Sequence, residues 1–302
     1  MEYLHNDKNS FTDALNHTRS LLGLTTTVIE KDYYVTMILR GLAESLPCIV
    51  FKGGTSLSKC HKIIRRFSED IDVTVDVKLS QGQMGKVKDA IKSVVSDLGL
   101  SIPNINETRS RRNYNKYIIA YESAVNFSED ALQPSVILET SFSEVSFPTV
   151  IFPVHSYIGD MLLDEAPEMV EGFRLNPFEM KVQGIDRTMI DKVFAICDYY
   201  MKGDVRRHSR HIYDIYKLLM NLSLDDEFSN LVKEVREIRA ANVGLCPSAQ
   251  PGVDVPALLE KIVMEEVYRA DYNNLTNRIL EEPISYETAI GAITKVARSG
   301  CF

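Results

Sequence analysis

The sequence has 302 residues, of which 45% are hydrophobic and 25% charged, and this ordinary globular composition argues against a disordered chain. A formal net charge of −8 argues against a protein that coats nucleic acid with its whole surface, although local basic patches remain possible. No apolar run approaches the ~20 residues that span a bilayer, and the start of the chain lacks a secretory signal, so we predict a cytoplasmic protein without a membrane partner.

The first predicted elements are a helix, a strand, a glycine turn and a second helix. Residues 25–39 carry threonines as a helix cap and apolar side chains at near-helical spacing. The apolar residues 48–51 predict a strand that ends at Gly53 and Gly54. The helix predicted after this turn has two stripes. One is apolar (Leu57, Cys60, Ile64 and Phe67) and the other is basic (Lys59, Lys62 and Arg66).

Polar and apolar residues then alternate from Asp70 to Val77, which predicts a half-buried strand. A helix is predicted at residues 81–98 and further strands at 117–121 and 136–142. From about residue 176 the pattern becomes helical, with predicted helices at 189–200, 211–222, 257–270 and 285–297. The sequence therefore predicts an α+β fold, in which a domain with a mixed sheet (residues 1–160) precedes a mainly helical C-terminal domain (residues 161–302).

The glycine turn is a candidate phosphate site. A strand that ends in Gly53-Gly54 and opens a helix exposes unpaired backbone N–H groups, and the positive end of the helix dipole also favours phosphate. Ser56 can add a hydroxyl donor, and Lys59 lies one turn into the helix. The alternative is a purely structural cap, because glycine pairs end many elements.

Asp70 and Asp72 form a candidate metal site. They lie two residues apart on one strand, about 6.6 to 7 Å between Cα atoms, with both side chains on the same face. Two carboxylates so placed can hold the paired cations of phosphoryl-transfer chemistry, and Mg²⁺ prefers such oxygen ligands. Glu139, inside a later apolar segment, is a candidate third carboxylate. The alternative is that all three acids are ordinary solvated strand residues.

These segments resemble the AbiEii/AbiGii-type nucleotidyltransferase toxins of the polymerase-β-like superfamily. The resemblance rests on FKGGTSLSK, RFSEDIDV and the later acid, and extends to VIEKDYYVT, MIDKVFAI and RHIYDIYKL. It implies a nucleotide-binding turn with a supporting lysine (Gly53, Gly54, Thr55, Ser56 and Lys59), a Mg²⁺ site (Asp70, Asp72 and Glu139) and two further catalytic residues (Lys192 and Asp214). Lys192 would contact the nucleotide, and Asp214 would organise that lysine or the acceptor.

The resemblance also implies a reaction and its partners. Family members move a nucleotide from an NTP to an acceptor, in studied cases the 3′ end of tRNA, and act as toxins beside a cognate antitoxin. The helical domain would contribute nucleotide and acceptor contacts. Alternatives are a protein hydroxyl or a small molecule as the acceptor, or a non-catalytic nucleotide-binding homologue.

Two basic clusters are candidate RNA contacts, with solvated charge as the equal alternative. One surrounds Tyr114 (Arg109, Arg111, Arg112 and Lys116) and the other lies further along the chain (Lys202, Arg206, Arg207, His208 and Arg210). No other chemistry competes, because the sequence has no GxSxG, HExxH or CxxC motif. The five cysteines are scattered, which predicts reduced thiols.

Overall fold

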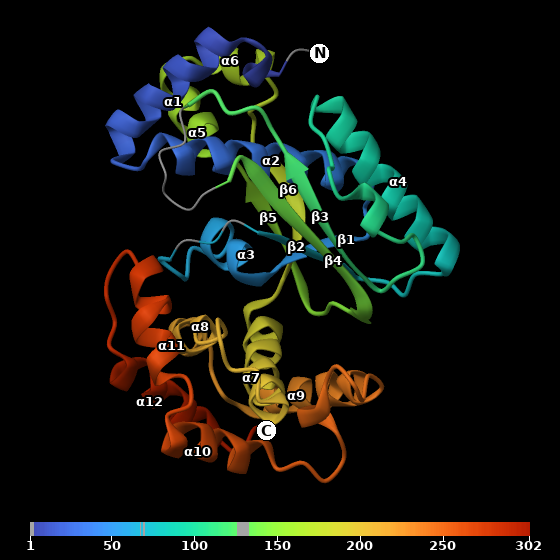
Figure 1. Cartoon of the computed structure of the whole chain (residues 1–302), viewed down its shortest axis with the longest axis vertical. Coiled ribbons are helices and arrows are strands. Elements are labelled where there is room, and N and C mark those ends of the chain that lie inside the picture. Colours follow the sequence, from blue (N-terminus) through green and yellow to red (C-terminus); the bar gives the residue numbers. More distant parts are fainter. Residues whose placement is uncertain (1–2, 67, 69, 126–132) are drawn as a thin grey trace. The chain divides into compact units, whose positions relative to one another are not determined.

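The computed structural model describes residues 3–66, 68, 70–125 and 133–302 (Figure 1). The chain divides into two compact units. Unit 1 is Met1–Thr55, Glu69–Val145 and Thr149–Val182, and unit 2 is Ser56–Ser68, Ser146–Pro148 and Gln183–Phe302. The chain enters unit 2 for the last time at Gln183, whereas the sequence predicted a domain boundary after residue 160. The difference arises because Phe178–Gln183 form a further strand of the sheet in unit 1.

Unit 1 is built on a mixed sheet, as predicted. Within the described residues the strands follow the order β3-β4-β2-β1-β6-β5. β1 is antiparallel to β2 and parallel to β6, while β4 is parallel to β2 and antiparallel to β3. The strands are β1 (Ile49–Lys52), β2 (Ile71–Val75), β3 (Tyr114–Ala120), β4 (Ser135–Val145), β5 (Thr149–Val154) and β6 (Phe178–Gln183). The sequence had not indicated β5 or β6.

Helices pack around this sheet, and α2 lies across one of its faces (Figure 1). The predicted cap is confirmed, because the Thr25 side chain accepts a hydrogen bond from the Val28 N–H. Ser80 and Gln83 form a reciprocal capping box at the start of α4. The helices that begin in unit 1 are α1 (Lys8–Leu22), α2 (Thr26–Ser45), α3 (Gly53–Lys59), α4 (Gln81–Asp97), α5 (Tyr157–Glu165) and α6 (Pro167–Gly172), with the 3₁₀ turns η1 (Leu4–Asn6) and η2 (Ile105–Glu107).

The helix after the glycine turn is shorter than predicted. α3 ends at Lys59 because the chain turns into the left-handed region at Lys62, with φ of 54°, and the Ile63 N–H closes the end on the Leu57 carbonyl at 2.9 Å. The predicted basic stripe therefore does not form. Lys62 is exposed, whereas Arg66 is buried and pairs with Leu280 in an isolated β-bridge. Phe67, predicted on the apolar stripe, lies outside the described residues.

Unit 2 is mainly helical, as predicted. α7 packs against α8, α9 and α10, and α12 packs against α8 and α10 around one apolar core. The elements are α7 (Ile185–Lys202), α8 (Arg210–Leu219), α9 (Asp226–Ala240), α10 (Val255–Glu265), α11 (Arg269–Asn274) and α12 (Tyr286–Ala297), with the 3₁₀ turns η3 (Pro247–Ala249) and η4 (Thr276–Ile279). The segment predicted as one helix at residues 257–270 divides at Glu266, where φ is 50°.

The described residues contain neither a disulfide nor a membrane-spanning helix. All five cysteines are free thiols, as the scattered spacing predicted. None of the helices in the described residues has the length and apolar character that crossing a membrane requires.

Candidate active site

A row of charged side chains crosses four neighbouring strands of unit 1. Asp72 on β2 pairs in register with Lys52 on β1 and with Glu139 on β4, and Glu139 pairs with Lys116 on β3. Register partners point to the same face of a sheet, so two adjacent carboxylates lie between two lysines. Lys116 Nζ is 3.8 Å from Glu139 Oε1. The side-by-side placement of the two acids confirms the predicted proximity of Asp72 and Glu139.

The glycine turn lies directly against one of these acids. Gly53 has φ of 80°, and a Cβ at this position would meet the Asp72 Oδ2 at 2.0 Å. Both the backbone conformation and the close approach therefore require glycine. The sequence predicted a turn here, and the structure adds that the turn packs on the carboxylate.

We expect Gly53→Ala to disturb both the turn and the acid. The left-handed conformation costs about 1 to 2 kcal/mol in a residue with a Cβ, and the Asp72 carboxylate must also move away. We therefore expect the free energy of unfolding to fall by about 1 to 3 kcal/mol and nucleotide transfer to fall with it. Gly82→Ala is the matched control, because its Cβ would meet nothing within 4 Å on helix α4. Equal denaturant midpoints of the two variants would contradict this view of the turn.

Thr55 connects the turn to the other predicted metal ligand. Its buried hydroxyl donates to the Asp70 backbone carbonyl at 2.6 Å. The side chain of Thr55 thus fixes the start of β2, a role that the sequence had not indicated. The Asp70 Oδ1 is buried and has no hydrogen-bond partner among the described residues. A buried carboxylate oxygen without a partner is costly, so this atom is suited to a cation.

The three acids do not yet form a closed metal site. In the described part of the chain, no three His, Cys, Asp or Glu side chains converge closely enough to hold a metal ion. Asp72 and Glu139 are neighbours through the register of β2 and β4, and Asp70 directly precedes β2.

Tyr114 belongs to the same group of residues. It precedes Lys116 by two residues on β3 and so shares its face. Burial raises the pKa of the Tyr114 phenol. The charge of Glu139, a hydrogen bond to Glu139, and the charges of Asp72 and Asp70 raise it further. A protonated phenol can donate to these carboxylates. The sequence placed Tyr114 only within a basic cluster, because nothing local shows that β3 lies beside β4.

In unit 2, the predicted residues Lys192 and Asp214 lie together. The Asp214 side chain is fully buried, and Lys192 Nζ donates to its Oδ2 at 2.6 Å. Arg66 also donates to both carboxylate oxygens, from Nε at 2.7 Å and from Nη2 at 2.8 Å. Asp214 thus fixes the ammonium of Lys192, and Arg66 is a partner that the sequence had not predicted.

The charges of this triad are balanced unevenly. Burial alone would raise the pKa of Asp214, but the positive charges of Arg66 and Lys192 hold it well below its usual range. Burial lowers the pKa of Lys192, and the carboxylate of Asp214 opposes that shift. One carboxylate faces two cationic side chains within this triad.

His211 lies beside the triad on α8, about one helical turn before Asp214. Burial and then the positive charges of Lys192 and Arg210 lower the pKa of His211 well below its usual value. Its Nδ1 is buried without a hydrogen-bond partner among the residues described. The imidazole is therefore neutral in the folded chain at physiological pH.

We expect the neutral state of His211 to make stability depend on pH. A lowered folded-state pKa means that the unfolded chain takes up a proton first, so the free energy of unfolding falls as pH drops below about 6.5. The contribution is at most about 1.4 kcal/mol per pH unit. Denaturant titrations of wild type and His211→Gln between neutral and mildly acidic pH test this. If the free energy of unfolding of the two proteins falls equally with pH, folding does not lower the pKa of His211.

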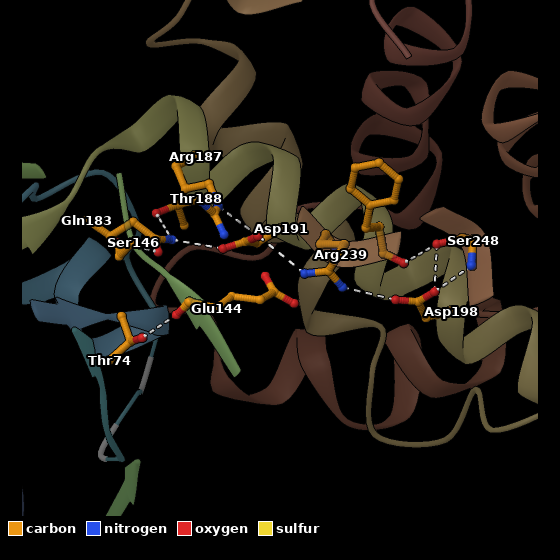
Figure 2. A network of polar contacts seen from close by, with 11 residues as sticks. Thr74, Glu144, Ser146, Gln183, Arg187, Thr188, Asp191, Asp198, Arg239 and Ser248 are labelled. Carbon is orange, nitrogen blue, oxygen red and sulfur yellow. Dashed lines mark hydrogen bonds and ion pairs between the residues drawn. The ribbon is translucent and has the colours of Figure 1, made fainter. Parts of the chain in front are cut away.

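A separate polar network holds α7, the helix that carries Lys192 (Figure 2). Asp191 accepts from Arg187 at 3.1 Å and from Arg239 at 3.3 Å. Arg239 also donates to Asp198 at 3.0 Å, and Asp198 accepts from the hydroxyl of Ser248 at 2.6 Å. These bonds connect α7 with α9 and η3. The network therefore fixes the position of α7 within unit 2.

The remaining predicted residues are placed as follows. Ser56 is fully buried, and Lys59 is half-buried near the end of α3. The first basic cluster is exposed before and along β3, although Lys116 pairs with Glu139. The second is exposed between α7 and α8 except for His208, which is half-buried.

Unit 1 thus combines a mixed sheet with a glycine turn that packs on one strand carboxylate beside a second acid. The family model of the nucleotidyl transferase AbiEii toxin, of type IV toxin–antitoxin systems, matches residues 38–292. The chain therefore belongs to this family and is a nucleotidyltransferase toxin. The sequence-based family prediction is confirmed.

One solved structure with a similar fold is the nucleotidyltransferase toxin MenT4 from Mycobacterium tuberculosis. The TM-score is 0.54 at 14% sequence identity, and the match covers 96% of this chain and 88% of that one. At this identity the likeness shows a shared fold. A sequence comparison with curated proteins finds no match.

Proposed function

We propose that the chain transfers a nucleotide from an NTP to the 3′ end of a tRNA, with Mg²⁺ as cofactor, and acts as a toxin in the cytoplasm. The observation that carries the proposal is the register of the central strands. It sets Asp72 beside Glu139, and Asp72 in turn lies against the glycine turn at Gly53. Donor chemistry needs these two elements together, because phosphate binding and cation binding must meet on one substrate.

The donor set of unit 1 fits Mg²⁺. Adjacent like charges on Asp72 and Glu139 repel each other, and the buried Asp70 Oδ1 has no hydrogen-bond partner among the described residues. A cation would offset both unfavourable features, and these ligands are oxygens, as Mg²⁺ prefers. Bound Mg²⁺ would supply positive charge to triphosphate oxygens. Asp70, Asp72 and Glu139 would hold it.

Other residues would bind and orient the nucleotide. The backbone N–H groups at Gly53 and Gly54 would donate to phosphate oxygens, and Ser56 would support the turn. Lys59 and Lys192 would supply positive charge to the triphosphate. The bond from Lys192 to Asp214 uses one of three ammonium protons, so two remain for donation. Asp214 would act by positioning that lysine.

The family also implies partners. An NTP is the donor, and a cognate antitoxin opposes the toxin. An RNA acceptor is consistent with the exposed basic clusters, because phosphate affinity rests on lysine and arginine.

The deciding experiment supplies the full chain with Mg²⁺, each labelled NTP in turn and total cellular RNA. We expect label at tRNA 3′ ends, identified by sequencing, and none from Asp70→Asn. Label on protein or on a small molecule would move the acceptor to another class, and no transfer with any NTP would indicate a non-catalytic homologue. Growth arrest without the antitoxin should likewise require Asp70.

A further inference from the structure

A pocket in unit 2 lies outside the residues assigned to nucleotide transfer. It has a volume of about 450 Å³ and is formed by the loop between α7 and α8 together with α11 and its flanking residues. That volume is within the range of ligand-binding pockets. Val267 and Leu275 contribute apolar walls, and Arg206 and Arg207 supply the positive charge.

Both arginines are available to a ligand. Arg206 and Arg207 are exposed, and within the part of the chain that the structure describes neither guanidinium has an ion-pair or hydrogen-bond partner. Asp271, the only acid among the described residues that line the pocket, is already hydrogen-bonded. Its carboxylate accepts from the Arg207 N–H at 2.8 Å and from the Ser209 N–H at 3.1 Å.

The loop that carries the arginines is held in a strained shape. Arg207 has φ of 67°, a left-handed conformation that residues other than glycine seldom adopt. The two bonds to Asp271 maintain it, and the Ser209 hydroxyl bonds Thr276 at 2.7 Å in the interior. His208 stacks on Tyr199 with ring centroids 3.4 Å apart. Such strain is characteristic of ligand clamps, and here it fixes the backbone that carries the two arginines.

We propose that this pocket binds a nucleotide of a single-stranded RNA acceptor. Arg206 and Arg207 contact its phosphates, and the apolar walls with Val267 and Leu275 receive the base. Planar guanidinium groups bind phosphate by paired hydrogen bonds and also stack on bases, so one site of this composition suits both parts of a nucleotide. Asn274 adds an amide that can donate to and accept from a base edge.

Charge supports RNA as the occupant. The whole chain carries −8, which repels a polyanion, so RNA must be captured where positive charge is concentrated. The arginine pair provides such a place. The inference rests on the proposed function in one respect, since it takes the acceptor to be RNA.

The test measures RNA binding separately from transfer. The full chain without NTP is titrated onto a short fluorescent single-stranded RNA with a free 3′ hydroxyl, and anisotropy is followed over a range of salt concentrations. Arg206→Gln with Arg207→Gln is expected to weaken binding by about tenfold or more and to reduce the slope of log affinity against log salt by about 1 to 2. Leu275→Ala should weaken binding to this RNA and leave binding to its abasic form unchanged.

The matched control is Lys295→Gln with Arg298→Gln, which removes the same charge from exposed positions on and after α12. It should retain most of the affinity, and circular dichroism should show equal folding of all variants. The proposal is overturned if the pocket variant binds as wild type, or if the control loses as much affinity. Nucleotide transfer is scored in parallel. A wild type that binds through the arginines without transferring contradicts the proposed function alone, whereas transfer with arginine-independent binding contradicts the pocket alone.

Discussion

Asp72→Asn is expected to reduce nucleotide transfer by about two to three orders of magnitude while the chain remains folded. Asparagine keeps the shape of the side chain but removes the charge that would offset a cation beside Glu139. The free energy of unfolding should change by less than about 1 kcal/mol, because the variant removes the repulsion from Glu139 together with the attraction to Lys52. Initial rates with labelled NTP and RNA, together with denaturant titration, measure both effects.

Asp89→Asn serves as the control for this comparison. Asp89 is an exposed residue of α4, and its replacement removes the same charge from unit 1. We expect unchanged transfer in this variant. Retained nucleotide transfer by Asp72→Asn would show that Asp72 is not a metal ligand. Unfolding of that variant would indicate that the carboxylate has a structural role instead.

The local pattern of the sequence predicted the glycine turn and the strand beside it, while the roles of their residues stay predictions. Alternation along β2 and the glycine pair after β1 are short-range signals, so they identify Gly53, Asp70 and Asp72 without knowledge of the fold. The pairing of Asp72 with Glu139 is long-range, and here the family resemblance supplied the missing link. The register of β2 and β4 then confirmed that the two acids are neighbours.

Residues with long-range partners were the ones missed. Arg66 fits a basic helical stripe when only spacing is considered, yet it is buried against Asp214, 148 positions further along the chain. Tyr114 and β6 were missed for the same reason, because their roles depend on which strand lies alongside. Spacing alone cannot reveal such partners, since strand order is not encoded in local periodicity.

Asp214→Leu is expected to cause the largest loss of stability, about 3 to 5 kcal/mol at neutral pH. The variant leaves Arg66 and Lys192 in the interior without their carboxylate. Lys192 can lose its proton and so reduce the penalty, whereas Arg66 remains charged at any accessible pH. Arg66 therefore accounts for most of the loss, which urea titration followed by circular dichroism can measure.

A double variant separates charge from packing. Arg66→Met with Asp214→Leu removes both members of the bidentate pair, and it should recover most of the stability because apolar groups can replace buried ion pairs at little cost. The pH dependence gives a second check. Because the folded-state pKa of Asp214 is lowered, its stabilising effect is complete above the unfolded value of about 3.9 and is lost as pH falls toward the folded value. Wild type should thus lose stability in acid through this group, and Asp214→Leu should lose less. Equal stability of the single and double variants would show that the unpaired Arg66 charge is not the cause, and that the packing around Asp214 is.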